Sequence, residues 1–279
     1  MAKSNYDSMD IIIKPSKGWS ALNLRELIRY RELLYFLAWR DIKIRYKQTI
    51  LGASWAILQP LFTMIVFTIF FGKMAKIPSE GVPYPIFSYA GLLPWTYFSN
   101  AVSLSGNSLI GSSNLITKVY FPRLYVPMGS TLAGLVDYVI ALTVLVGMMI
   151  WYRFAPRVEM LLIPIIMLLC LLASTGVGMW LSAMNVKYRD IKYAIPFLIQ
   201  LWLFATPVIY PTSMLSEKYK WLMTLNPMTG VIEAHRAMIL GNNSIDWLAL
   251  AISSGIIIFI FITGASYFKR MERYFADLI

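Results

Sequence analysis

The stretch MLLIPIIMLLCLLASTGVGMWLSAMNV, residues 160–186, carries no charged side chain along its whole length. A helix rises 1.5 Å per residue, so about 20 apolar residues cross the roughly 30 Å hydrocarbon core of a bilayer. This stretch therefore predicts a membrane-spanning helix. The small residues ASTGVG, 173–178, predict a close approach to another helix, either inside one bundle or between two copies of the chain.

Five further windows are long enough to hold a span, and Asp137 is the only charged residue inside them. They cover residues 48–72, 81–117, 124–152, 193–216 and 247–268. The chain is 58% hydrophobic and 14% charged, whereas soluble domains have about 25% charged residues. We therefore predict an all-α integral membrane protein with six transmembrane helices in residues 51–268.

The basic residues are distributed unevenly along a chain whose formal net charge is +11. Most of the 25 lysines and arginines lie near the two ends, between the second and third windows, or between the fourth and fifth. With six spans these segments share one side of the membrane, which the positive-inside rule identifies as the cytoplasm. We expect both termini there, including residues 269–279. Topology thus accounts for the basic excess, and nucleic acid is not expected as a partner.

The segment before the first span is predicted to be a cytoplasmic tail over residues 1–22 and an amphipathic interface helix over residues 23–50. Trp39, Ile42 and Tyr46 recur at helical spacing, and basic residues lie on a rotated face. Two roles stay open for this helix. It either only orients the first span or also meets an anionic lipid headgroup or a phosphate-bearing substrate. The basic residues concerned are Arg40, Lys43, Arg45 and Lys47.

Asp137 falls inside the third window, where an ionised carboxylate is costly and usually faces a bundle interior or a water path. A single carboxylate does not make an ion-coupling site, because such sites need several converging polar groups. Two interpretations remain: Asp137 is a structural partner of a basic or hydroxyl group, or it belongs to a transport path.

The segment between the fifth and sixth windows, residues 212–246, is predicted to be external. Its apolar part, residues 229–240, is too short to cross a bilayer and lies between Asn226-Pro227 and Gly241, which predicts short re-entrant gate helices. Glu233 and Arg236 are three residues apart and can pair on a helix. For His235, packing, gating and catalysis all stay open. A metal site is not expected, since no second ligand stands at metal spacing.

The chain shows no nucleotide site of its own. GNSLIGSS, residues 106–113, has the glycine spacing of a phosphate loop but Ser112 where the motif requires lysine. Cys170, the single cysteine, lies within a predicted span, so a cysteine-based metal cluster is not expected either. We expect no cofactor in this chain, and a gradient or another polypeptide must supply the energy.

Four phrases together resemble the permeases of type-two ATP-binding-cassette exporters, most closely the branch that exports O-antigen, capsule and teichoic-acid chains. They are RDIKIRYKQTILGASWAILQPLFTMIVFTIFFG (40–72), GLLPWTYFSNAVSLSGNSLIGSSNLITKVYFPRLYVP (91–127), NVKYRDIKYAIPFLIQLWLFATPVIYP (185–211) and LNPMTGVIEAHRAMILG (225–241). The resemblance runs from about residue 25 to the C-terminus. It implies a non-catalytic subunit in a bacterial cytoplasmic membrane, where two copies form the channel for a polyprenyl-pyrophosphate-linked glycan.

The resemblance also implies two copies of a separate ATPase that binds ATP and Mg²⁺. A coupling helix at about 113–123 would contact this ATPase through its charges and apolar anchors. The residues concerned are Lys118, Val119, Tyr120, Phe121, Pro122 and Arg123.

Other roles are implied for residues of the predicted spans and of the external segment. The first and fifth spans would line the channel, where aromatic rings offer sugar faces a stacking surface. These residues are Trp55, Gln59, Phe62, Phe67, Phe197, Trp202, Phe204 and Tyr210. Glu233, His235 and Arg236 would lie near the exit, at the external gate.

Two other functions are alternatives to polysaccharide export. An exporter of the same fold could carry a drug, a peptide or a small lipid. An integral-membrane glycosyltransferase or acyltransferase would need paired carboxylates, or a histidine with an acidic partner, at a membrane boundary. No DxD or HxxxD pattern of that kind stands at a span end.

Overall fold

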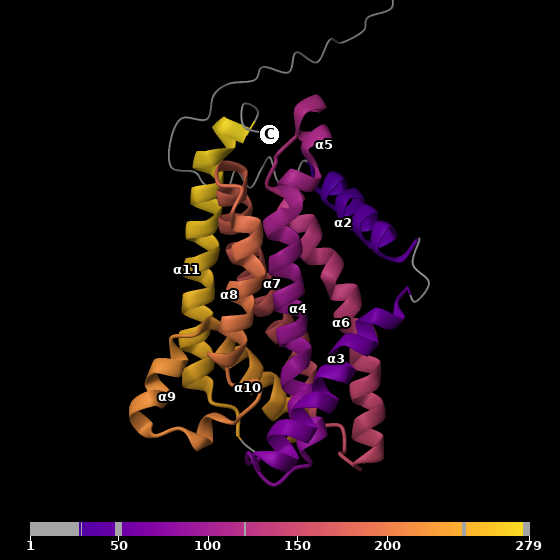
Figure 1. Cartoon of the computed structure of the whole chain (residues 1–279), viewed down its shortest axis with the longest axis vertical. Coiled ribbons are helices and arrows are strands. Elements are labelled where there is room, and N and C mark those ends of the chain that lie inside the picture. Colours follow the sequence, from indigo (N-terminus) through magenta and orange to yellow (C-terminus); the bar gives the residue numbers. More distant parts are fainter. Residues whose placement is uncertain (1–27, 29, 48–51, 120, 242–243, 276–279) are drawn as a thin grey trace, which may run out of the picture.

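The computed structural model describes residues 28, 30–47, 52–119, 121–241 and 244–275, and every regular element in these ranges is helical (Figure 1). The all-α prediction is confirmed. The predicted tail, residues 1–22, and most of the start of the predicted interface helix lie outside the described residues.

Long helices are interspersed along the chain with short helical elements of three to eight residues. They are α2 (Arg31–Tyr46), α3 (Ser54–Phe67), the π-helical η1 (Thr68–Met74), α4 (Tyr84–Gly111), α5 (Ser113–Lys118), α6 (Tyr125–Trp151), the 3-10 turn η2 (Val158–Leu162), α7 (Ile163–Lys187), α8 (Ile191–Phe204), η3 (Thr212–Met214), α9 (Glu217–Thr224), α10 (Pro227–Leu240), α11 (Trp247–Met271) and η4 (Glu272–Tyr274).

Four helical stretches in the described part are long and apolar enough to cross a membrane. They are Ser54–Met74, Tyr125–Trp151, Val158–Lys187 and Trp247–Tyr274, and each coincides with a predicted window. The windows 81–117 and 193–216 instead contain α4 and α8. Helix α4 has 28 residues but is rich in serine, asparagine and tyrosine, and α8 has only 14 residues. The count of six spans therefore stays a prediction.

Helix α4 runs through the middle of the bundle, with α3 and α6 towards one side and α8 and α11 towards the other (Figure 1). It packs against α6 and α7 along much of its length and also contacts α3, α8 and α10. Phe87, Tyr89 and Phe98 of α4 are fully buried. A helix enclosed in this way need not be apolar all round, because little of its surface meets lipid.

Small residues set the close contacts between the long helices. A Cβ atom on Gly176 of α7 would lie 2.8 Å from the Cα of Phe261 in α11, and one on Gly178 would collide with Ser105 of α4. Such distances leave room only for hydrogen. The predicted close approach at residues 173–178 is thus confirmed, and it occurs inside one chain.

Helix α10 begins and ends where the sequence predicts. The Asn226 side chain accepts a hydrogen bond from the Met228 N–H at 3.1 Å, Pro227 occupies the first turn, and Gly241 ends the helix with φ +64°. Proline at the start and glycine past the end are the preferred helix boundaries. Nearly every residue of α10 is buried, and α9 and α10 lie at the opposite end of the bundle from α5 (Figure 1).

Candidate functional site

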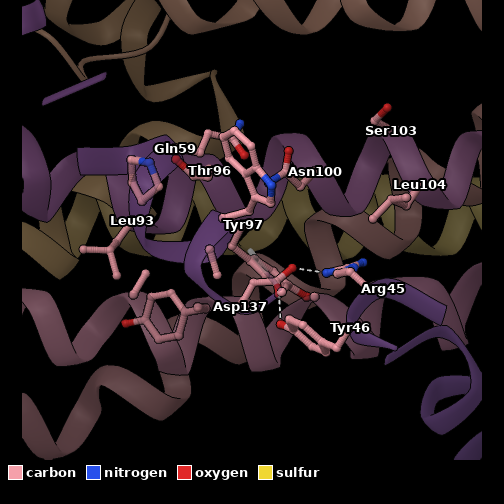
Figure 2. A pocket seen from close by; sticks show the side chains of 17 residues that line it. Arg45, Tyr46, Gln59, Leu93, Thr96, Tyr97, Asn100, Ser103, Leu104 and Asp137 are labelled. Carbon is pink, nitrogen blue, oxygen red and sulfur yellow. Dashed lines mark hydrogen bonds and ion pairs between the residues drawn. The ribbon is translucent and has the colours of Figure 1, made fainter. Parts of the chain in front are cut away.

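The end of helix α2 is bound to the middle of α6 by an ion pair and a hydrogen bond, which we call the α2 junction (Figure 2). Arg45 bonds to one carboxylate oxygen of Asp137, and the Tyr46 hydroxyl donates to the other. The Arg45 and Asp137 side chains are 24% and 21% exposed, so water screens this pair only in part. The interpretation of Asp137 as a partner of a basic or hydroxyl group is confirmed on both counts.

A second carboxylate, Asp41, strengthens the same junction. It accepts a hydrogen bond of 2.7 Å from Ser130 of α6 and forms an ion pair of 2.8 Å with Arg40. A Cβ on Gly129 would lie 3.1 Å from the Cβ of Leu37, so α2 and α6 cross closely here. The polar face of α2 is therefore turned towards α6 and anchors the helix there.

These contacts divide the four basic residues for which contact with a lipid headgroup or a phosphate was one of two open roles. Arg40 and Arg45 are ion-paired inside the chain, while Lys43 and Lys47 are exposed. Burial lowers the pKa of Arg45, which Tyr46 and Asp41 oppose, but an arginine still stays charged at neutral pH. The Lys43 ammonium lies 5.6 Å from the ring of Trp39, on the same side of α2. The apolar face and the basic face of α2 are thus closer together than the spacing of these residues in the sequence predicts.

A pocket of about 300 Å³ lies beside this junction, between the end of α2 and the helices α3, α4 and α6 (Figure 2). Trp55 and Gln59, two of the predicted channel residues, form its α3 wall. Its α4 wall carries Thr96, Asn100 and Ser103, and Asp137 closes the α6 side. The pocket thus combines ring surface, amide and hydroxyl groups, and one neutralised ion pair.

Of the other residues predicted to line a channel, some lie on exposed faces of α3 and α8 and the rest have contacts inside the protein. Phe62 of α3 is 57% exposed, and it shares a face with Trp55 and Gln59 at spacings of three and four residues. Phe197 and Phe204 of α8 are 61% and 55% exposed.

The other three predicted channel residues have structural contacts. Phe67 is buried. The Trp202 N–H donates to the Asn226 side chain at 3.0 Å, and the Tyr210 hydroxyl donates to the Phe204 carbonyl at 3.2 Å.

His235 and Arg236, which were predicted at an external gate, are buried side chains that join helices. The His235 Nδ1 lies 2.8 Å from the Ala90 carbonyl oxygen, and its Nε2 lies 2.8 Å from the Tyr138 hydroxyl. A carbonyl only accepts, so Nδ1 carries the hydrogen and a neutral ring accepts from Tyr138. His235 therefore links α10 to both α4 and α6.

Arg236 donates hydrogen bonds to the carbonyl oxygens of Phe87 and Val208, at 3.3 and 3.0 Å, and its guanidinium lies 3.8 Å from the centre of the Phe87 ring. Glu233 accepts a bond of 3.2 Å from the Thr212 N–H. Burial raises the pKa of Glu233, which this hydrogen bond opposes. Each residue thus has its hydrogen bonds elsewhere, but the charges of Glu233 and Arg236 still act on each other. Arg236 opposes the rise that burial causes in the pKa of Glu233, and Glu233 opposes the fall that burial causes in the pKa of Arg236. Both residues border a cavity of about 320 Å³ at this end of the bundle.

In the predicted coupling segment, some side chains are exposed to solvent and others are buried in the protein or bonded to it. Helix α5 ends at Lys118, which is exposed, and Val119 is 53% exposed. Phe121 is buried in a cluster of this chain's own side chains, so it cannot also be a free anchor. The Arg123 guanidinium donates to the Glu272 carbonyl at 2.6 Å and so binds the C-terminal turn. Tyr120 lies outside the described residues.

The polar stripe on α4 was not singled out from the sequence. Thr96, Ser99, Asn100, Ser103 and Asn107 recur at helical spacing, and each is partly exposed. A polar stripe with this period inside an apolar window indicates a face turned towards a cavity or another polar surface. The helical spacing of these polar residues can be read in the sequence, and it would have identified the α4 wall of the pocket.

Comparison with known proteins is consistent with this arrangement. The sequence pattern of the family described as "ABC-2 type transporter" matches residues 32–240, which is more than half of the chain. The chain belongs to the ABC-2 type transporter family. It is similar to the O-antigen export system permease protein RfbA of Myxococcus xanthus, with 29% identity over 92% of this chain and 98% of that one.

Two further relatives have related descriptions. The O-antigen export system permease protein RfbA of Klebsiella pneumoniae is 29% identical over 89% of this chain and 95% of its own length. The polysialic acid transport protein KpsM of Escherichia coli is 21% identical over 72% of this chain and 78% of its own.

Proposed function

We propose that this chain is the permease subunit of an ATP-driven exporter of a lipid-linked polysaccharide such as O-antigen. The observation that carries the proposal is the end-to-end similarity to permeases described as O-antigen exporters, which covers 92% of this chain and 98% of the relative from Myxococcus xanthus. Similarity over the full length favours the same overall assembly, since both the membrane helices and the cytoplasmic connections are included.

The exposed faces of α3 and α8 support a channel shared by two copies. Trp55 and Phe62 on α3, and Phe197 and Phe204 on α8, leave ring surface uncovered on helices that both pack against α4. Lipid covers most exposed apolar faces of a membrane bundle, and we propose that these rings, on the predicted first and fifth spans, instead face the second copy. In a homodimer these rings would border a common passage, where sugar rings could slide across them.

The topology follows from the same proposal. Six spans, comprising α4, α8 and the four long apolar stretches, place α5 and both termini in the cytoplasm and α9 and α10 outside. Helix α2 then lies along the cytoplasmic side of the bacterial inner membrane. The external segment would form the gate, with Glu233 as its polar contact, while His235 and Arg236 hold α10 in place.

Energy would come from two copies of a separate ATPase that bind ATP and Mg²⁺. Lys118 and Val119, the outward side chains after α5, would contact this subunit, and Phe121 would hold the segment from inside.

Co-expression tests the assembly directly. The tagged chain is produced with a candidate ATPase subunit, in a strain that lacks its own permease, and is then purified from detergent. We expect an ATPase to be retained and surface glycan to be restored. A variant of the ATPase without its phosphate-loop lysine should assemble but not export. Loss of ATPase retention would contradict the proposal, and hydrolysis stimulated only by a drug, peptide or small lipid would favour that alternative.

A further inference from the structure

The pocket beside the α2 junction contains polar side chains whose hydrogen-bonding groups are unused within the described part of the chain. Among the described residues, the side chains of Gln59, Thr96, Asn100 and Ser103 make no hydrogen bond, although all four line the pocket. Their neighbours differ: Ser99 donates to the Thr96 carbonyl at 3.1 Å, and Asn107 donates to the Ser103 carbonyl at 2.8 Å. Polar groups within a membrane protein are costly unless they find a partner.

The charge of the pocket is balanced. Arg45 and Asp137 are the only charged residues in its described lining, and they are paired with each other. An anion such as a pyrophosphate would have to compete with Asp137 for Arg45 and would then lie beside an uncompensated carboxylate. A neutral ligand meets no such penalty.

The remaining features fit a hydroxylated ring. Trp55 and Tyr97 contribute ring surface, and the amides of Gln59 and Asn100 can each donate and accept hydrogen bonds. A sugar presents apolar C–H faces for rings and hydroxyls for amides. The volume of about 300 Å³ lies at the lower end of the roughly 300–1,000 Å³ range of small-ligand pockets, which suits one ring unit.

We infer that this pocket is a subsite that binds a single neutral sugar unit through Gln59, Thr96, Asn100 and Ser103. The inference rests on the proposed function, because it assigns one contact of the exported glycan to a defined wall. It also assigns a role to Arg45 of α2, which shapes the pocket through Asp137 and does not bind the substrate's phosphates.

Thiol protection tests the subsite in the complete transporter. Ser103→Cys places a thiol in the pocket, and Ile110→Cys, on the same helix and 43% exposed but outside the pocket lining, is the matched control. The native Cys170 is fully buried, so it should stay unlabelled in the folded protein. Labelling by a small maleimide is followed with added neutral hexoses or N-acetylhexosamines, with glycerol, and with inorganic pyrophosphate.

We expect at least one neutral sugar to slow labelling of Ser103→Cys several-fold, and no sugar to affect Ile110→Cys. Glycerol and pyrophosphate should have no effect on either variant. Equal labelling with every sugar, or protection by pyrophosphate, would overturn the inference.

Export by isosteric variants gives a second, independent measurement. The triple variant Thr96→Val, Asn100→Leu, Ser103→Ala removes three partners and should reduce glycan export about tenfold or more. Its control, Ser99→Ala with Thr143→Val and Thr263→Val, removes hydroxyls that already bond to carbonyls of their own helices. Wild-type export with unchanged export by the triple variant would refute the subsite alone. Absence of wild-type export would instead refute the proposed function.

Discussion

Arg45 at the end of α2 and Asp137 near the middle of α6 form an ion pair, although 92 residues separate them in sequence. The pair joins the helix before the first predicted span to the third predicted span. It also forms one wall of the pocket that we assign to a sugar unit. If the proposed ATPase moves α2 from the cytoplasmic side, the movement would therefore reach this pocket through Asp137.

Removing one charge of this pair should destabilise the protein more than removing both. Asp137→Asn and Arg45→Gln each leave a partly buried charge without its partner, so we expect a loss of about 1–3 kcal/mol for either single variant. The double variant should recover part of that loss. Thermal unfolding of the purified protein in detergent measures this, with Lys43→Gln as an exposed control on α2. A double variant no more stable than the singles would contradict the coupling.

The bond between Tyr138 and His235 should contribute to stability because both side chains are buried. Tyr138→Phe keeps the ring but leaves the Nε2 of His235 without a donor, which costs about 1–3 kcal/mol. Tyr219→Phe on α9, where the side chain is 56% exposed, should leave the unfolding temperature unchanged. Equal unfolding temperatures for both variants would show that the bond between Tyr138 and His235 does not contribute to stability.

Two glycines should respond in opposite directions to the same substitution. At Gly176 a Cβ would meet the backbone of Phe261 at 2.8–2.9 Å, so Gly176→Ala must push α7 and α11 apart and should cost about 1–3 kcal/mol. A Cβ on Gly255 of α11 would have no atom of the described residues within 4 Å outside its own stretch of helix. Gly255→Ala should therefore stabilise the helix by about 0.5–1 kcal/mol. Unfolding temperatures that move in the same direction would be evidence against the tight crossing at Gly176.

The exposed and the buried side chains of the segment after α5 should respond differently to substitution in a binding experiment. Val119→Asp changes an exposed side chain and should lower the amount of ATPase that co-purifies several-fold, with an unchanged unfolding temperature. Phe121→Ala removes a buried ring and should cost about 3–5 kcal/mol of stability. Val158→Asp, at a valine that is 79% exposed near the opposite end of the bundle, is the control. Normal ATPase retention by Val119→Asp would remove this residue from the proposed contact.

The sequence predicted those features that depend on local pattern. The uncharged run at residues 160–186 became α7, and Asn226, Pro227 and Gly241 marked both ends of α10. The need of Asp137 for a basic or hydroxyl partner also followed from its place in an apolar window. Each of these depends on neighbours within a few turns of one helix or on the membrane itself.

Contacts between distant segments could not be predicted in the same way. Nothing near Asp137 identifies Arg45 and Tyr46 as its partners, and nothing near Arg236 identifies the carbonyls of Phe87 and Val208. Helical spacing brought the charges of Glu233 and Arg236 near each other, but tertiary packing supplied the hydrogen-bond partners of both. Phe121 likewise matched an interface anchor in type, while the fold placed it in the interior.

The polar composition of α4 also affects the order in which the membrane domain can be assembled during synthesis. In the six-span topology that we propose, α4 is made second, yet most of the helices that cover it, including α6, α7 and α10, are made later. Until they arrive, the serines and asparagines of α4 must face lipid or the insertion machinery, where each polar group raises the free energy of insertion. Stable integration of α4 therefore depends on the later part of the chain.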